Sequence, residues 1–167
     1  MSDMIAIHEA FKRGDLEGLK SLLGNPSEFP NYDELQWIGH VLEYANYHSP
    51  LPFIRQLLEL GANPNYEHRA GFPSLIAALS TDRSDKAEIV ELLLSHGANI
   101  QQVGHNGYTP LHWAAADDEP GMVELLLKRG ADPKAKTTVD DCTTPLEEAE
   151  NFGREKAAAA IRKFLAP

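Results

Sequence analysis

Seven histidines, one cysteine and a surplus of carboxylates are the side chains of this 167-residue sequence that could catalyse a reaction or bind a metal. Their spacing fits neither task, because the sequence has no HExxH or CxxC pattern, no serine in a GxSxG turn and no glycine-rich phosphate loop. Cys142 stands next to Asp140 and Asp141, whose negative charge disfavours the thiolate that a nucleophile needs. We therefore expect no catalytic residue, no metal and no cofactor. A hydrolase or metal enzyme is the alternative that these patterns argue against.

Aromatic side chains, with histidine and arginine among them, suit a different task. Tyrosine, tryptophan and arginine are the residue types that most often anchor protein interfaces. The candidate partner-binding residues of this sequence are Tyr44, Tyr47, Tyr66, His68, Arg69, Phe72, His105, Asn106, Tyr108 and Trp113. Packing of these side chains in the core, or between neighbouring loops, is the structural alternative.

Three consecutive carboxylates, Asp117, Asp118 and Glu119, are candidates for an acidic rim that contacts a basic partner. The alternative is a solvated turn, in which Asp118 adopts the left-handed backbone that aspartate tolerates better than most residues. The whole chain has 25 acidic and 15 basic residues, a formal charge of −10. This charge repels DNA and anionic membranes and attracts a basic protein, although it also serves solubility alone.

Other global features concern the compartment. No apolar run approaches the roughly 18 residues that span a bilayer. The first residues, MSDMIAIHEAFKRGD, lack the basic start and apolar stretch of a secretory signal. The single Cys142 cannot form an internal disulfide, which fits a reducing compartment. We expect a cytoplasmic monomer that binds neither nucleic acid nor membrane.

A repeated framework must position the candidate residues. One phrase occurs as LLELGANPN at 57–65, LLLSHGANI at 92–100 and LLLKRGADP at 125–133, with glycines 36 and 33 residues apart. A second phrase runs in phase with it, as FPSLIAAL at 72–79, TPLHWAAA at 109–116 and TPLEEAEN at 144–151. A period near 33 is typical of a solenoid, which binds through an extended surface built across its units.

Each unit is predicted to form a helix, a turn, a second helix and a loop. Thr109 and Pro110 suit a helix start, the segment DDEPG ends that helix, and Gly130 ends the next one. The pattern predicts an all-α chain of about five helix pairs, with β-structure only in loop hairpins. The second pair is expected to begin with a longer helix over 30–48. In the terminal units, Ile5 and Phe164 are expected on the buried sides.

The segment TPLHWAAADDEPGMVELLLKRGADP, residues 109–133, resembles the ankyrin repeat, with its Thr-Pro-Leu-His start, paired alanines, leucine-rich second helix and Gly-Ala-Asp end. The resemblance extends over about the whole chain and implies a single domain, 1–167, of five stacked units. These are an N-terminal capping repeat (1–29), a divergent repeat (30–65), a repeat with a four-residue insertion (66–102), the repeat closest to the family pattern (103–135) and a C-terminal capping repeat (136–167).

The resemblance implies an α-solenoid whose first helices line a concave surface, whose second helices form a convex back, and whose loops project as short β-hairpin fingers. It also implies that His112 ties the loop backbone together, and that His8 does the same in the first unit. Family members bind other proteins through finger tips and first helices. We therefore expect a non-catalytic module that captures a partner protein on its concave face. The alternative within binding is an acidic inhibitor or immunity-type protein that neutralises a basic enzyme or toxin.

Overall fold

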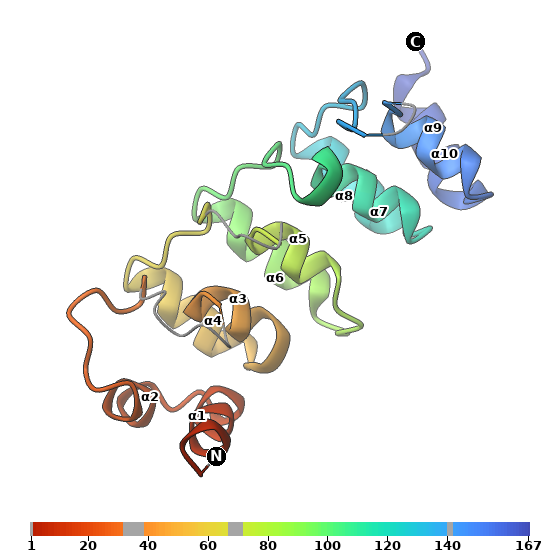
Figure 1. Ribbon diagram of the computed structural model, residues 1–167. Helices are drawn as coiled ribbons and strands as arrows, with labels where there is room; N and C mark the ends of the chain where they lie inside the picture. The colour runs from red at the N-terminus through yellow and green to blue at the C-terminus, as the bar shows by residue number, and fades with distance from the viewer. Residues whose placement is uncertain (1, 32–38, 67–71, 140–141) are drawn as a thin grey trace.

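The computed structural model describes residues 2–31, 39–66, 72–139 and 142–167 of the chain. Over these residues the chain forms five successive helix pairs (Figure 1). The helices are α1 (Ser2–Arg13), α2 (Leu16–Leu22), α3 (Val41–His48), α4 (Leu51–Glu59), α5 (Ser74–Leu79), α6 (Lys86–Ser95), α7 (Pro110–Ala116), α8 (Pro120–Lys128), α9 (Pro145–Asn151) and α10 (Glu155–Leu165), with a short 3₁₀ turn, η1 (His105–Gly107). The all-α solenoid predicted from the repeats is confirmed.

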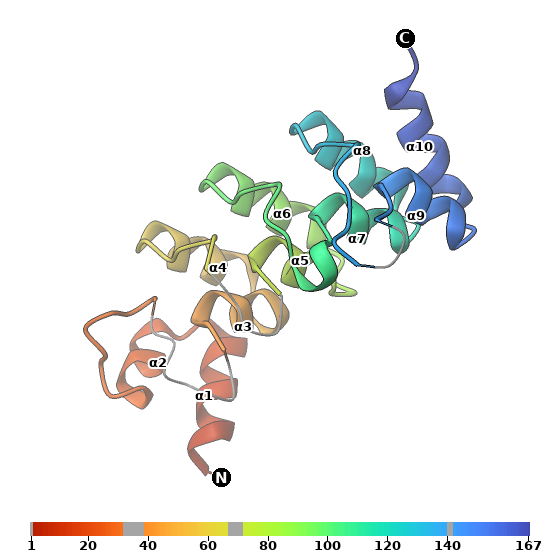
Figure 2. The same ribbon diagram turned by 45° about the horizontal axis from the view of Figure 1, so that its top comes forward.

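The pairs stack side by side, and the two chain ends lie at opposite ends of the stack (Figure 1). First helices pack on first helices in the order α1, α3, α5, α7, α9, while α4 packs on α6 and α8 on α10. The two rows of helices are separated in Figure 2. Each unit expected from the sequence contains one pair, and the boundaries between units stay a prediction.

Local interactions explain where several helices begin and end. Thr109 accepts from the backbone N–H of His112, and the side chain of His112 accepts from the backbone N–H of Thr109, which makes a reciprocal capping box at α7. Thr144 and Glu147 make the same box at α9. These boxes confirm threonine as the N-cap of the Thr-Pro starts.

The repeated glycines end the second helices, as the sequence predicted. Gly61, Gly97 and Gly130 have φ values of 92°, 85° and 92°. A side chain is disfavoured in this left-handed region, so glycine is the residue that terminates these helices at low cost.

Burial explains the small and branched residues of the first helices. All six residues of α5 are buried, because α3 and α7 cover it on two sides and α6 on a third. In α7, Ala114 and Ala115 are almost completely buried, and their small side chains let the neighbouring helices approach closely.

Three details of the sequence prediction are wrong. The first helix of the second pair starts at Val41 rather than near residue 30, because Gly39 is left-handed (φ 64°) and His40 is extended (φ −77°, ψ 145°). Ile5 is 65% exposed and Phe164 is 50% exposed, since each lies on the outer side of a terminal helix pair that has only one neighbour.

A ladder of asparagine side chains connects successive units at the ends of the second helices. Asn31 donates to the carbonyl oxygen of Gly61 (3.0 Å) and accepts from the backbone N–H of Asn63 (2.7 Å). One unit later, Asn65 donates to the carbonyl oxygen of Gly97 (2.8 Å) and accepts from the backbone N–H of Asn99 (2.6 Å). Each amide therefore satisfies backbone groups that the adjoining helix end leaves unpaired.

The fingers are closed by single backbone hydrogen bonds, and no β-strand is present in the residues that the structure describes. The backbone N–H of Gly104 donates to the carbonyl oxygen of Tyr108 (2.8 Å). In the last finger, the backbone N–H of Thr137 donates to the carbonyl oxygen of Thr143 (3.0 Å). Gln102 links one finger to the preceding one by donating to the carbonyl oxygens of Asn65 and Tyr66.

The asparagine ladder generates a stability prediction. Asn65→Ala removes two hydrogen bonds between units, so the free energy of unfolding should fall by about 1–2 kcal/mol. Urea unfolding followed by circular dichroism measures the change, with Gln56→Ala, an exposed amide on α4, as the control. Equal unfolding midpoints for the two variants would show that the ladder contributes nothing.

Candidate protein-binding surface

An aromatic and histidine cluster covers the first helices of the two N-terminal pairs. The Tyr44 hydroxyl lies 2.9 Å from Nδ1 of His8, and its ring centroid lies 4.4 Å from that of His48. The ring centroids of His8 and His48 are 5.0 Å apart. Partial burial, and then the positive charges of His8, Arg83 and Lys12, lower the pKa of His48. Tyr44 is half-buried and therefore serves both the packing of α1 on α3 and the surface.

Tyr47 lies one turn further along α3 and is also half-buried. Its hydroxyl is 2.9 Å from the hydroxyl of Ser80, at the end of α5. This bond fixes the ring across the junction between the second and third units. Burial raises the pKa of Tyr47, so the phenol stays protonated and can donate at neutral pH.

A second aromatic group, the Phe72–Trp113–Tyr108 trio, bridges the third and fourth units. The Trp113 ring centroid is 5.9 Å from that of Phe72 and 6.4 Å from that of Tyr108. All three side chains are half-buried, so each keeps part of its ring in contact with solvent. The structure thus brings together three residues that lie in two different loops and one helix.

Tyr66 was expected on a finger, and this placement is wrong. The side chain is only 5% exposed, its ring stacks on His40 with centroids 4.2 Å apart, and its hydroxyl donates to the carbonyl oxygen of Phe72 (3.3 Å). Tyr66 therefore belongs to the core of the finger base. The neighbouring candidates His68 and Arg69 lie outside the described residues.

The candidates in the next finger divide into exposed side chains and structural backbone. His105 and Asn106 are exposed. Asn106 is left-handed (φ 59°), and its carbonyl oxygen accepts from the backbone N–H of Thr138 (3.0 Å). Gly107 permits this approach, because a Cβ there would lie 2.6 Å from the Thr138 nitrogen. Packing between neighbouring fingers, the alternative weighed for this loop, is thus present.

The acidic rim is mostly structural. Asp118 is left-handed (φ 55°), as predicted, and its carboxylate accepts from the backbone N–H of Ala157 (2.9 Å) in the first turn of α10. Glu119 pairs with Lys86 at 2.8 Å. Of the three, only Asp117 is exposed. Partial desolvation of its carboxyl group, and then the charge of Glu119, raise its pKa.

The predicted tie through His112 is confirmed. The imidazole is completely buried, its Nδ1 accepts from the backbone N–H of Thr109 (3.2 Å), and its Nε2 is 3.1 Å from the carbonyl oxygen of Thr143. This pairing requires the neutral ring with its proton on Nε2. His8 does not repeat the role, because it lies in the middle of α1 and contacts Tyr44 instead.

The four-residue insertion of the third unit joins two units. Arg83 makes a bidentate pair with Asp85 (2.8 and 2.7 Å) and donates to the carbonyl oxygen of Ser49 (2.6 Å) at the end of α3. The guanidinium holds the pKa of Asp85 below its usual range. The described contacts of Arg83 in this insertion are therefore structural.

Glu148 was not among the candidate residues predicted from the sequence. This residue lines a cavity of about 180 Å³ between the last finger and α9, together with Val139 and Phe152. The available signal was the alignment of TPLEEA with TPLHWA, which puts Glu148 at the position of Trp113. The residue is 6% exposed, and desolvation raises the pKa of its carboxyl group.

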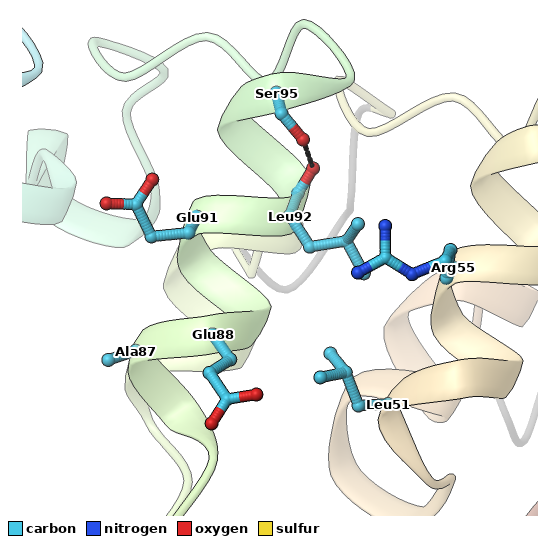
Figure 3. Close-up of a pocket in the computed structure, with 7 residues that line it drawn as sticks. All are labelled: Leu51, Arg55, Ala87, Glu88, Glu91, Leu92 and Ser95. Atoms are coloured by element: carbon cyan, nitrogen blue, oxygen red, sulfur yellow. Dashed lines mark hydrogen bonds between the residues drawn. The ribbon is translucent and has the colours of Figure 1, made fainter.

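The opposite side of the molecule carries a groove of about 470 Å³ between α4 and α6. Figure 3 shows Arg55 reaching from α4 toward α6 and Glu88 reaching back toward Leu51, whereas Glu91 points away. Glu91 pairs with Arg129 of the next unit. The groove thus has a small apolar floor and side chains of both charges, and it lacks the adjoining aromatic rings of the first-helix side.

Two searches of the described part of the chain bear on other classes of function. No group of three histidine, cysteine or carboxylate side chains there is arranged to hold a metal ion. None of the helices described is both long and apolar enough to cross a bilayer.

Comparison with known families decides the class of the chain. A model of ankyrin repeats, in three copies, matches residues 7–137, which is most of the sequence. The chain belongs to the ankyrin repeat family. Repeats of this family generally mediate protein–protein interactions and are typically non-catalytic.

Curated proteins from a plant and from animals are similar to this chain, and two of those below are named for ankyrin repeats. It is 34% identical over 114 residues to a putative E3 ubiquitin-protein ligase, XBAT35, of Arabidopsis thaliana. It is 32% identical over 124 residues to human ankyrin repeat and SOCS box protein 11, and 28% identical over 159 residues to the ankyrin repeat and KH domain-containing protein mask-1 of Caenorhabditis elegans. The match to XBAT35 covers 67% of this chain but 24% of that protein. The match to ankyrin repeat and SOCS box protein 11 covers 74% of this chain and 36% of that protein, and the match to mask-1 covers 95% of this chain and 6% of that protein.

The His112 tie of this ankyrin domain generates a pH prediction. Burial lowers the pKa of His112, so its stabilising effect is complete above about pH 6.5 and is lost as the pH falls below this value, because the unfolded chain takes up the proton first. The free-energy difference between the wild type and His112→Gln should therefore shrink from pH 8 to pH 5.

Comparison of variants is necessary because Glu43 acts in the opposite direction. Burial raises the pKa of Glu43 to about 7, from an ordinary value of 4.5. The protonated side chain therefore stabilises the fold at low pH, and this stabilisation is lost as the pH rises from 4.5 through 7. Thermal unfolding at several pH values measures the differences, with His105→Gln as the exposed control. A pH-independent difference between wild type and His112→Gln would contradict the neutral, buried imidazole.

Proposed function

We propose that this ankyrin domain is a non-catalytic module that binds a partner protein through the Phe72–Trp113–Tyr108 trio and through Tyr44 and Tyr47 on α3 of the second unit. The trio carries the proposal, because three aromatic rings from two units lie next to one another and keep part of their surface in solvent. Large aromatic side chains at the centre of a surface supply most of the binding energy in protein interfaces.

The indole of Trp113 supports a role in binding rather than in stability. Its Nε1 is buried and donates to no acceptor among the described residues. A buried unpaired donor costs about 1–3 kcal/mol, so a phenylalanine or leucine would stabilise the stack better at this position. The tryptophan is therefore better explained by what its ring presents to a partner.

The proposed site excludes Tyr66, Asp118 and Glu119, whose side chains are committed within the molecule. Exposed His105 and Asn106 would contact the partner at the finger tip, and exposed Asp117 would contribute negative charge at the far end of α7. We place the protein in the cytoplasm as a monomer, on the basis of its single cysteine and its acidic surface.

Replacement of both Tyr108 and Trp113 by alanine tests the proposal. The double variant should lose capture of the partner, with a loss of at least about 3 kcal/mol of binding free energy, while its helical circular dichroism stays close to that of the wild type. Partners identified by cross-linking in the source cell would be purified and titrated calorimetrically.

The matched control changes the second-helix side, on α4. Arg55→Ala with Leu60→Ala alters two exposed residues of the α4 region and should leave affinity unchanged. Undiminished binding by the Tyr108 and Trp113 double variant, or loss with the α4 pair, would move the interface elsewhere.

A second candidate, inhibition of a basic enzyme or toxin, is favoured by the formal charge of −10. Long-range attraction would make the association rate fall by roughly tenfold or more between low and high salt. Stopped-flow measurement with the purified partner, using the tryptophan fluorescence of the domain, gives this rate directly. A rate that does not change with salt would remove the charge argument for this candidate.

A further inference from the structure

The cavity around Glu148 is a built feature of the C-terminal unit. The last finger lies over α9 and encloses a volume of about 180 Å³, the size of a single side chain rather than of a peptide. Val139 and Phe152 line it, and both are exposed apolar side chains, at 36% and 58%. The ring of Tyr108 forms part of the same wall.

The polar side of the cavity is a buried carboxylate. Glu148 accepts a hydrogen bond from the hydroxyl of Tyr108 at one oxygen and from the hydroxyl of Thr143 (2.7 Å) at the other. These neutral donors orient the carboxylate, and no cationic side chain of the described chain pairs with it. A buried charge without an opposite charge is costly, so a cation that enters the cavity would gain an unusually strong partner.

We propose that this cavity binds one lysine or arginine side chain of the partner protein, with its charged end at Glu148 and its aliphatic stem against Phe152 and Val139. Lysine and arginine combine an aliphatic stem with a charged end. Their methylene groups can pack on apolar surface while the charged end contacts a polar group. Tyr108 belongs both to the cavity wall and to the aromatic trio, so the cavity would extend the trio with a specificity pocket. The inference rests on the proposed function, since it assigns the chemistry of one contact.

The alternative occupant is a purely apolar side chain, held by Phe152 and Val139. Small probes distinguish the two without any knowledge of the partner. They are N-acetyl-lysine methylamide, N-acetyl-arginine methylamide and N-acetyl-norleucine methylamide, the last of which has an aliphatic stem but no charge. Backbone amide shifts of the full isotope-labelled chain report where each probe binds.

The two cationic probes should shift the amides of Thr143, Glu148 and Phe152 in a saturable way, and norleucine should bind at least roughly tenfold more weakly. Glu148→Gln keeps the shape but removes the charge. Its amide oxygen can accept from one of the two hydroxyls, and its NH2 group can donate to the other. This variant should weaken the cationic probes by a similar factor. Glu155→Gln, which removes an exposed carboxylate outside the cavity, should have no effect.

Phe152→Ala supplies an independent variant. Because this side chain is 58% exposed, its loss should disturb folding little, and it should weaken the cationic probes severalfold. Equal binding of norleucine, unchanged binding by Glu148→Gln, shifts centred on another part of the surface, or no saturable binding would each overturn the assignment. The probes do not involve the partner, so failure here is distinct from failure of the Tyr108 and Trp113 test.

Discussion

No helix pair of this protein can bury its own apolar surface, and this constraint governs the whole structure. The helix α5 is the clearest case, because all six of its residues are buried only when α3, α6 and α7 are present. Where a neighbour is missing, apolar side chains stay in solvent, as Ile5 and Phe164 do at the two ends. Stability therefore depends on interfaces between units, as expected for a linear repeat protein.

Polar contacts reinforce the same junctions. Asn65 ties the end of α6 to the preceding loop, Arg83 ties the insertion to the end of α3, and Asp118 accepts from the first turn of α10. Each of these side chains joins segments roughly one unit apart. Polar side chains that the sequence alone leaves on the surface are thus used for stacking, which reduces the acidic rim to Asp117.

The surface left for binding is what stacking does not consume. Trp113 and Glu148 occupy equivalent positions in adjacent units, yet one presents an aromatic ring and the other a buried carboxylate beside a cavity. The framework is constant at these positions because the leucines, alanines and glycines around them repeat. Variation of a single side chain on this framework is therefore enough to change the chemistry of the surface, which is why family membership alone does not define the partner.

The sequence by itself determined the number of helix pairs, the Thr-Pro helix starts and the glycines that end the second helices, because a capping box or a terminal glycine acts within a few residues of its own position. It also identified the half-exposed rings of Phe72, Tyr108 and Trp113. It did not determine where α3 begins. Only the tertiary structure decided that Tyr66 is buried against His40, that Asp118 and Glu119 bind neighbouring units, and that Glu148 lines a cavity. These outcomes depend on contacts between residues about one repeat apart, such as Asp118 with Ala157, whose geometry local sequence does not encode.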